Sequence, residues 1–351
     1  MNITTWQHLL TPVLIPLGHA YAKIMALRAS AYSNHIFPTW QPTVPCISVG
    51  NISWGGTGKT PMVSWILDWA ARTHRHPAVL TRGYHALPPH VPFHVQAASL
   101  PSQAGDEPLM LAKKHPQADI VVDPKRIRSG PWAERTLQPD LFILDDGFQH
   151  LAVQRQIDLV LLAPDDLGKA WDNVIPSGSW REGSKALQRA HAFIVNTTGA
   201  SLDRLLPLAT KRLGYLHKPI YFVELFPTGL RHLTTGRSVL DVQKEPYFLF
   251  TGIANPERVI RTATALLKSP PEDHLFFPDH HSFTLDDLSL IRERTTSCGA
   301  KHILCTTKDG IKISPCSEDP IWEIQTTIRF MARLNTSLWL AEYLEQKIQK
   351  G

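Results

Sequence analysis

The stretch SWGGTGKTP, residues 53–61, lies between a short apolar run, PCISVG at 45–50, and a helical pattern of apolar residues. A glycine-rich turn between a strand and a helix directs backbone N–H groups toward a phosphate, with a lysine on the β- and γ-phosphates and a hydroxyl on Mg²⁺. The strict pattern requires Gly at position 53, where this chain has Ser. We therefore predict a variant nucleotide-phosphate loop, in which Lys59 neutralises phosphate and Thr60 helps to hold Mg²⁺. Its residues are Ser53, Trp54, Gly55, Gly56, Thr57, Gly58, Lys59 and Thr60.

The residues around this loop predict the fold class. Nearly continuous apolar runs alternate with helical stretches, which is typical of a parallel sheet covered by helices on both faces. The runs that follow the loop are residues 77–84, 119–123, 141–146, 157–164, 191–196 and 219–226. A smaller set of strands and helices occupies 247–307, after a loosely patterned candidate linker at 228–246. We expect an α/β protein with a P-loop NTPase-like parallel sheet, a smaller C-terminal α/β domain and an N-terminal amphipathic helix.

Composition and pattern suggest how the 351 residues are organised. With 43% hydrophobic and 19% charged residues, the chain can bury a core and is not disordered. The net charge of +5 favours an anionic partner but falls short of a nucleic-acid signature, and we expect no obligate protein partner. The four cysteines form no C-x-x-C pair, which favours a reducing compartment without disulfides or structural zinc. The predicted parts are a helix at 1–28, a P-loop domain at 29–226, a smaller domain at 227–327 and a C-terminal helix at 328–351.

The N-terminal segment leaves two interpretations open. Its first charges are Lys23 and Arg28, and its polar residues and prolines suit neither a membrane-spanning helix nor a signal peptide. Its apolar residues recur at helical spacing, so the helix could pack on its own domain or rest on a membrane surface. This stripe consists of Leu10, Val13, Leu14, Leu17, Tyr21, Ile24 and Leu27.

Two adjacent carboxylates follow a buried strand in FILDDGFQH, residues 142–150. Asp145 and Asp146 thus lie at the carboxyl end of a strand, where the aspartate that completes a Mg²⁺ site stands beside a phosphate loop. Neighbouring carboxylates repel each other and favour a cation. We therefore predict that both acids contribute to a metal site.

Each of three further motifs, taken singly, has an ordinary structural interpretation. In GDEP (105–108), Asp106 is a favourable helix cap. The DHH stretch at 279–281 is weak as a metal site, and PSGSWRE (176–182) can be a surface loop whose Arg181 is available for phosphate.

In this order, GNISWGGTGKTP, LTRGY, AGDEPLMLA, FILDDGFQH, IPSGSWRE, FTGIANPERV and FPDHHSFT resemble the tetraacyldisaccharide 4′-kinase family. The collinear match covers about residues 45–312. The resemblance implies transfer of the γ-phosphate of ATP to the 4′-hydroxyl of a tetraacyl glucosamine disaccharide 1-phosphate, which gives lipid IVA. It also implies an active site in the cleft between two domains, and an N-terminal helix that docks on the cytoplasmic face of the bacterial inner membrane. The cofactors would be ATP and Mg²⁺.

The same resemblance assigns roles to individual residues. Asp106 becomes the catalytic base together with His280, so the capping interpretation of Asp106 is reversed. Lys59 and Thr60 match the phosphate-loop residues, and the aspartates at 145 and 146 match the metal-site acids. Candidates for contacts with the lipid phosphate or the nucleotide are Arg82, Gln149 and Arg181.

The chain departs from the family pattern in places. It reads CTTKDGIK at 305–312, where the family commonly has TTEKD-x-x-K, and it has Trp180 where L-R-E is usual. These departures concern acceptor detail, such as the number and length of the acyl chains, rather than the reaction.

Two other functions remain possible on sequence grounds. A P-loop regulatory ATPase would hydrolyse nucleotide at a membrane without phosphorylating a lipid. The partitioning ATPases of that class carry a Lys where this chain has Trp54. A soluble small-molecule kinase or ligase would have no affinity for membranes.

Overall fold

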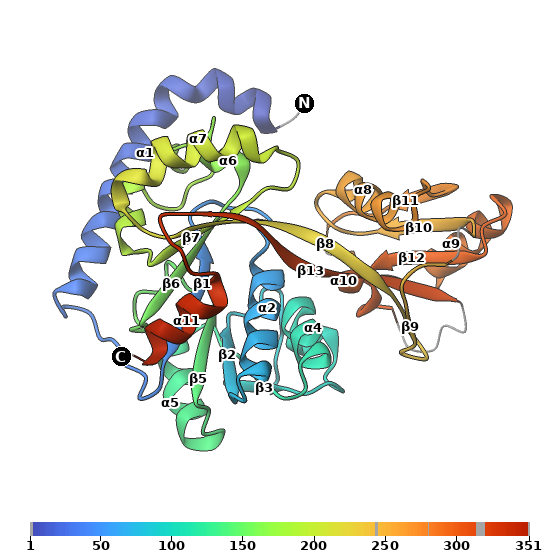
Figure 1. The fold of residues 1–351 in the computed structure, drawn as a ribbon, viewed down its shortest axis with the longest axis horizontal. Coiled ribbons are helices and arrows are strands. Elements are labelled where there is room, and N and C mark those ends of the chain that lie inside the picture. Colours follow the sequence, from blue (N-terminus) through green and yellow to red (C-terminus); the bar gives the residue numbers. More distant parts are fainter. Residues whose placement is uncertain (1–2, 243–244, 280, 314–319, 350–351) are drawn as a thin grey trace.

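The computed structural model describes residues 3–242, 245–279, 281–313 and 320–349, with the side chains of the first helix from Leu14 onward. Figure 1 shows a larger and a smaller lobe joined by the long strands β8 (Ile220–His232) and β13 (Ile321–Leu334). Across the described residues, one sheet of 13 strands runs through both lobes. Its order is β11-β10-β12-β13-β8-β7-β6-β1-β5-β2-β4-β3, and β9 (Ser238–Val239) pairs with β8.

The strands of the larger lobe coincide with the apolar runs of the sequence. Successive side chains of a strand point to opposite faces, so a strand that is apolar at every position needs cover on both. In β5, Ile143 lies in one core while Phe142 and Leu144 lie in another. All pairs among these strands are parallel except that of β3 with β4. The strands are β1 (Cys46–Asn51), β2 (Pro77–Thr81), β3 (Phe93–Val95), β4 (Asp119–Val122), β5 (Leu141–Asp145), β6 (Ile157–Leu162) and β7 (Ala192–Asn196).

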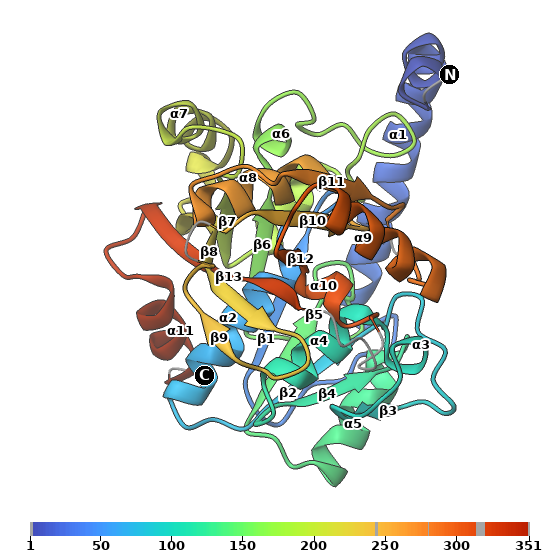
Figure 2. The ribbon, with the colours of Figure 1, turned by 90° about the vertical axis from the view of Figure 1, so that its right-hand side faces the viewer.

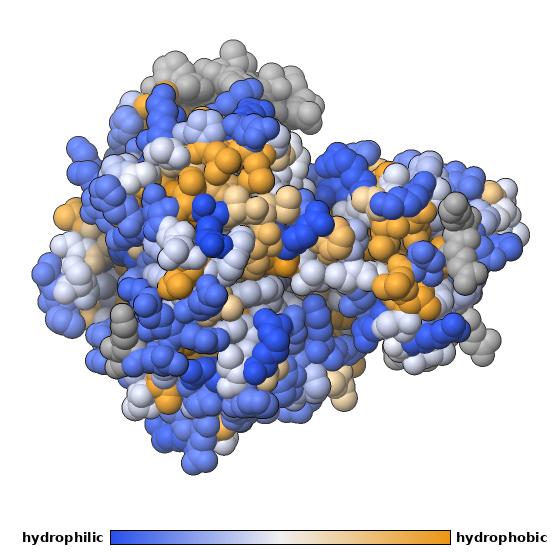
Figure 3. Space-filling model, in the orientation of Figure 1, coloured by the Kyte–Doolittle hydropathy of each residue, from blue (hydrophilic) through white to orange (hydrophobic). Residues whose placement is uncertain are grey.

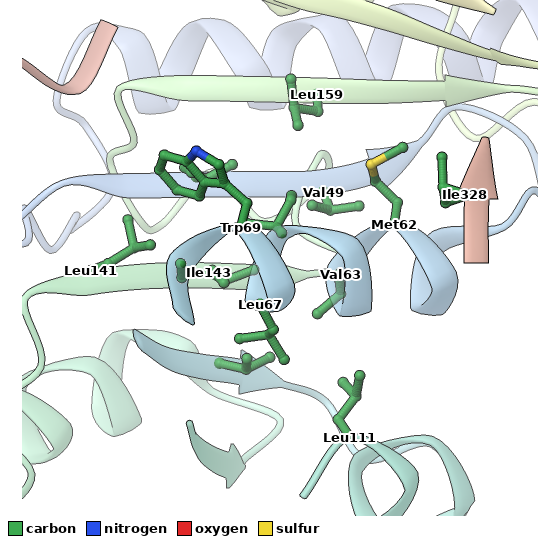
Figure 4. Close-up of a cluster of buried hydrophobic side chains, with 14 of the residues drawn as sticks. Val49, Met62, Val63, Leu67, Trp69, Leu111, Leu141, Ile143, Leu159 and Ile328 are labelled. Carbon is green, nitrogen blue, oxygen red and sulfur yellow. The ribbon is translucent and has the colours of Figure 1, made fainter. Parts of the chain in front are cut away.

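Helices cover both faces of this part of the sheet, as predicted. Figure 4 shows Met62 of α2 in one buried cluster with Val49 and Leu159 of the central strands. Full burial of one such side chain contributes roughly 1.5–3 kcal/mol, so this cluster fixes α2 and the loop before it against the sheet. On this face lie α2 (Lys59–Arg72), α4 (Asp106–Lys114) and α11 (Leu340–Gln349), and on the other α1 (Ile3–Ser33), α5 (Arg126–Thr136) and α7 (Leu202–Leu213). Short helical turns are α3 (Pro101–Ala104), α6 (Pro164–Leu167), η1 (Ser184–Arg189) and η2 (Gly214–Leu216).

The smaller lobe repeats this two-faced arrangement. Its helices begin at side-chain caps, because Asn255 accepts from the N–H of Arg258 and Thr284 forms a capping box with Asp287. One helix covers each face of the three parallel strands. The elements are β10 (Tyr247–Thr251), α8 (Pro256–Leu267), β11 (Asp273–Phe276), α9 (Leu285–Ser297), β12 (His302–Thr306) and α10 (Thr307–Gly310).

Two expectations about the connecting segments are wrong. The predicted linker at 228–246 begins inside β8, and the predicted C-terminal helix from Ile328 is strand as far as Leu334, with α11 starting only at Leu340. The physical reason is the long antiparallel pairing of β8 with β13, in which paired residues lie about a hundred positions apart in the sequence. The hydrogen bonds and packing of this pairing override the local helical pattern. The domain boundaries placed at 226/227 and 327/328 both fall inside these strands. The division of the chain into four parts stays a prediction.

Helix α1 lies along the outer side of the larger lobe (Figure 1). Gly18 lets it approach the 174–178 segment, because a Cβ there would come 2.9 Å from Ser177 Oγ. Tyr21 and Ala22 pack against the core beneath, whereas Leu17, Ile24 and Leu27 are 52%, 61% and 70% exposed. The side chains of Leu10 and Val13 lie outside the described residues. Within the part of the chain that the structure describes, no helix has the length and apolar character needed to cross a membrane.

Candidate active site

The phosphate loop connects β1 to α2 through residues 52–58. Gly55 and Gly58 have φ angles of 122° and 97°, which side chains disfavour, so glycine is required at both turns. Nothing lies within 4 Å of a Cβ built on Gly55 or Gly56. The loop therefore leaves open space in front of its backbone at the N-terminus of α2, as a phosphate site needs.

Ser53 and Trp54 hold the phosphate loop in place. Ser53 Oγ donates to Asp166 Oδ2 at 2.9 Å, and the Asp166 carboxylate also accepts from Trp180 Nε1 at 2.9 Å. The N–H of Trp54 donates to the carbonyl of Ser179 at 2.8 Å, while its side chain is 66% exposed. The PSGSWRE segment is thus bound to the phosphate loop, and its Trp180 is fully buried.

Lys59 lies within a cluster of polar groups from the same lobe. Its Nζ donates to Asn51 Oδ1 at 3.1 Å and lies 3.5 Å from Asp146 Oδ1. Arg181 approaches the same two partners, with Nη2 at 3.0 Å from Asp146 Oδ1 and a further bond to Asn51 Oδ1. Burial raises the pKa of Asp146, but Lys59, Arg181 and Arg126 outweigh it and bring that pKa down to about 2. The sequence predicts a cation beside Asp146. In the structure, two cationic side chains, Lys59 and Arg181, lie beside this carboxylate.

Asp145 has a different environment from its neighbour. Its Oδ2 accepts from Thr81 Oγ1 at 2.8 Å, while its Oδ1 is buried without a hydrogen-bond partner. Burial, and next the charge of Glu107, raise the pKa of Asp145 to about 6. Thr60 Oγ1 donates to Glu107 Oε2 at 2.7 Å, so the threonine hydroxyl and these two carboxylates surround one spot.

This spot fits the Mg²⁺ ion that the sequence predicts. Its donors are hard oxygens, and the orphaned Asp145 Oδ1 together with two repelling carboxylates would gain from a divalent cation. Among the described residues, no three His, Cys, Asp or Glu side chains gather closely enough to form a metal centre alone. Mg²⁺ usually binds one or two carboxylates and keeps water and phosphate oxygens as its other ligands.

Asp106, at the start of α4, faces the smaller lobe. Lys312 Nζ lies 3.2 Å from Asp106 Oδ2 and also donates to the carbonyl of His281 at 3.2 Å. Asp106 is the first residue of α4, and Lys312 follows the end of α10 by two residues. Figure 2 shows α10 beside α4. His280, the predicted partner of Asp106, lies outside the described residues. The His281 side chain instead meets Asp287 Oδ2 at 2.9 Å, within its own lobe.

Asp309 supports the DHH segment within the smaller lobe. Its buried carboxylate accepts from Thr251 Oγ1 at 2.7 Å, from the N–H of Gly252 at 3.0 Å and from Thr306 Oγ1 at 2.6 Å. A Cβ on Gly252 would come 3.3 Å from His281 Cβ, so glycine allows the DHH segment to approach. The FTGI and KDGIK motifs therefore form one support for the DHH segment.

The predicted acceptor-binding residues lie around the DDGFQH turn. Gln149 Nε2 donates to the backbone carbonyl of Asn51 at 3.0 Å, and the backbone carbonyl of Gln149 accepts from Arg28 Nη1 of α1 at 3.2 Å. Arg82 is exposed at the end of β2. Burial, followed by four nearby arginines, lowers the pKa of His150 to about 4, so that imidazole is neutral near pH 7. The four are Arg126, Arg155, Arg28 and Arg82. An anionic group would be attracted to this rim.

On its other flank the loop borders a surface groove. Asn196 Nδ2 donates to the carbonyl of Thr57 at 3.2 Å, and the residues after Asn196 line a hollow of about 420 Å³. A second hollow of about 430 Å³ adjoins it, where Arg258 and Arg329 stand over β8. Figure 3 shows apolar surface on this face between α7 and the crossing of β8 with β13. Hollows of this size suit a small ligand.

Comparison with known protein families shows to which family this chain belongs. The sequence model described as LpxK, tetraacyldisaccharide-1-P 4'-kinase, matches residues 10–345. The chain belongs to this family. It is 40% identical over 347 residues to the tetraacyldisaccharide 4'-kinase of Nitratidesulfovibrio vulgaris (99% of this chain, 97% of the relative). It is 43% identical over 344 residues to that of Oleidesulfovibrio alaskensis (97% and 93%).

A solved structure of the family has the same fold. The crystal structure of LpxK from Aquifex aeolicus in complex with ATP superimposes with a TM-score of 0.75 and 26% identity, covering 97% of this chain and 99% of that one. The resemblance inferred from the motifs is thereby confirmed, as is the P-loop α/β fold.

In this member of the tetraacyldisaccharide 4′-kinase family, sequence reasoning missed three site residues. Asn51 joins Lys59 to Arg181, Glu107 joins Thr60 to the Asp145 site, and Lys312 reaches Asp106 from the other lobe. Glu107 was signalled by its place next to Asp106 in GDEP. Lys312 ends the KDGIK stretch and was visible only as part of a motif without an assigned role.

Proposed function

We propose that this chain is an ATP-dependent kinase, a phosphotransferase with an alcohol acceptor, that phosphorylates the 4′-hydroxyl of a tetraacyldisaccharide 1-phosphate to form lipid IVA in lipid A biosynthesis. The 4′-oxygen forms a bond with the γ-phosphorus, the bond from that phosphorus to the bridging oxygen breaks, ADP leaves, and the hydroxyl proton is released. The observation that carries the proposal is the hydrogen bond from Thr60 of the phosphate loop to Glu107, the residue after Asp106. This contact joins the start of α2 to the start of α4, where Asp106 lies.

Asp106 is the proposed acceptor of the hydroxyl proton. A sugar hydroxyl has a very high pKa, so a positioned carboxylate that takes the proton during transfer lowers the barrier. The family resemblance pairs Asp106 with His280, which would orient or polarise it across the cleft. Lys312 contacts the same carboxylate from the smaller lobe. Closure of the two lobes would then assemble the base.

The nucleotide would bind along the phosphate loop. Lys59 would neutralise the β- and γ-phosphates, and backbone N–H groups of Gly55 to Thr60 would cradle them. Bound Mg²⁺ would supply further neutralisation of phosphate charge, held by Thr60, Asp145 and Asp146, with Glu107 beside them. The hollow beyond Asn196 has room for the nucleoside part of ATP.

The acceptor would approach from the side of α1. A tetraacyl lipid is anchored in a bilayer, and α1 exposes Leu17, Ile24 and Leu27 on one side of the helix. We place the protein at the cytoplasmic face of the bacterial inner membrane as a peripheral enzyme. Arg82, Gln149 and Arg181 would then contact acceptor or nucleotide phosphate at the DDGFQH turn.

The test is transfer of labelled γ-phosphate from ATP onto a tetraacyldisaccharide 1-phosphate in mixed micelles, with and without Mg²⁺. The matched control is the same lipid with its 4′-hydroxyl blocked. We expect Mg²⁺-dependent label at the 4′ position and none on the blocked lipid. Hydrolysis of ATP without labelled lipid would instead identify a regulatory ATPase, and the proposed reaction would be wrong.

A further inference from the structure

Lys312 is a nearly buried cation at the contact between the lobes. Its side chain is 6% exposed and that of Asp106 is 16% exposed, so their 3.2 Å ion pair is largely shielded from water. A lysine in such a place is costly unless its charge is paired and its donors are used. Lys312 satisfies this condition with one partner in each lobe, the Asp106 carboxylate and the His281 carbonyl.

The backbone around Lys312 fixes its position. Ile311 packs into the core of the larger lobe, while Ile313 packs into the core of the smaller one. Gly310 permits this packing, because a Cβ there would come 2.7 Å from Leu233 Cδ2. The turn before them is held by the buried Asp309. Lys312 is therefore set at the point where the two lobes meet.

The chemistry of this contact concerns a carboxylate with a proposed catalytic task. A charge-assisted hydrogen bond from an ammonium group to a carboxylate is shorter and stronger than a neutral one. A fixed ion pair also restricts the rotation of the carboxylate, and proton transfer depends on such positioning. Because Lys312 also binds the His281 carbonyl, it connects this carboxylate to the DHH segment.

We propose that Lys312 is a positioning residue for phosphoryl transfer, which holds the Asp106 carboxylate in place and ties it to the DHH segment where the lobes meet. This inference rests on the proposed role of Asp106 as proton acceptor. Lys312 acts through Asp106 and is not itself given a contact with substrate.

The test uses the full-length enzyme with four variants, Lys312→Met, Lys312→Gln, Lys312→Arg and Asp106→Asn. The control is Lys301→Met, since Lys301 forms a 3.0 Å ion pair with Glu245 in the smaller lobe and is 64% exposed. For Lys312→Met we expect kcat to fall about 30-fold, with KM for ATP within about twofold of wild type. Lys312→Gln should lose as much, because it can donate to the His281 carbonyl but has no charge. Lys312→Arg should keep at least about a third of kcat, because the charge remains, and Lys301→Met should match wild type.

A double-substitution cycle separates a positioning role from general stabilisation. In the Asp106→Asn background, Lys312→Met should lower kcat by less than about threefold, because the pair is already broken. An equal loss in both backgrounds would overturn the proposal, as would unchanged kcat in Lys312→Gln or a raised KM with normal kcat. Should Lys312→Met melt below the assay temperature, Lys312→Gln and Lys312→Arg decide the outcome. Full transfer by Asp106→Asn alone would instead refute the proposed base, which is a separate failure.

Discussion

Lys59 of the phosphate loop and Asp106 at the start of α4 are held in place in different ways. Lys59 is positioned by Asn51 and Asp146, which belong to the same lobe and lie at the ends of adjacent parallel strands. Asp106 is positioned by Lys312, which comes from the other lobe and follows it by about two hundred residues. The proposed phosphate side is therefore complete within one lobe, whereas the proposed base side depends on how the two lobes meet. This difference predicts that the two sides fail separately.

The largest effect is expected on the phosphate side. Lys59→Ala removes the cation that would neutralise the β- and γ-phosphates, and we expect kcat to fall by about 10²–10³-fold. The fold should survive, because Arg181 still pairs with Asp146 at 3.0 Å. Steady-state transfer measures kcat, and the melting temperature measures the stability of the fold. Lys185→Ala is the control, because Lys185 is exposed. A near-normal kcat would contradict the loop assignment.

A second prediction separates stability from activity at Asp145, a proposed Mg²⁺ ligand. The folded-state pKa of Asp145 is about 6, above its ordinary 3.8, because of burial and the Glu107 charge. Protonation of this carboxyl therefore stabilises the ligand-free fold fully below its ordinary pKa, and that contribution is lost as pH rises through about 6. Asp145→Asn should raise the stability of the ligand-free protein at about pH 8 by roughly 2–3 kcal/mol, and much less at about pH 4. Transfer activity should fall sharply, since a proposed Mg²⁺ ligand is lost.

Thermal melting at the two pH values measures the first effect. Asp158→Asn is a control of opposite sign, because Asp158 is buried but paired with Arg155 at 2.8 Å and its loss should destabilise the fold. A lower melting temperature for Asp145→Asn at the higher pH would show that this carboxylate is well accommodated without a cation.

The exposed side of α1 gives a third, smaller effect. Replacing Leu17, Ile24 and Leu27 by Ser should weaken binding to anionic vesicles by at least about tenfold, because apolar area that would enter the bilayer is removed. The control replaces Leu240 and Leu285, which are 80% and 79% exposed on the smaller lobe. Sedimentation with vesicles compares the two. Equal binding by both variants would assign α1 to packing on its own lobe alone.

Ser53 provides the smallest effect. Ser53→Gly restores the strict loop pattern but removes the hydrogen bond to Asp166, at a cost of about 1 kcal/mol of stability. We expect kcat within about threefold of wild type, because the hydroxyl faces the loop support rather than the open side. A large loss of kcat with unchanged stability would place this hydroxyl on the nucleotide.

Local pattern was sufficient for much of the fold. Each strand from β1 to β8 in the larger lobe, except the short β3, begins within an apolar run that the sequence displays, because two-sided burial demands continuous apolar residues. The far end of β8 and all of β13 were missed, since their stability comes from pairing with each other across a long sequence separation. A helical pattern after Ile328 gave the opposite expectation, and tertiary pairing overrode it.

The site follows the same division. Lys59, Thr60 and Asp145 could be placed from the sequence, because a strand, a turn and a helix in succession determine where they point. The pairing of Lys312 with Asp106, and of Thr60 with Glu107, could not, because each depends on packing between separate elements. Motif order identified the family without revealing these contacts.

The most direct test of the account compares Asp106→Asn with the wild type in two assays on the same preparations. One measures single-turnover transfer of the γ-phosphate to the tetraacyl lipid, and the other measures the affinity for a non-hydrolysable ATP analogue with Mg²⁺. We predict that transfer falls by about 10²-fold, while the affinity stays within about twofold, because the phosphate side is complete without Asp106. Undiminished transfer, or an equal loss in both assays, would contradict the separation of a phosphate side within one lobe from a base side shared by two.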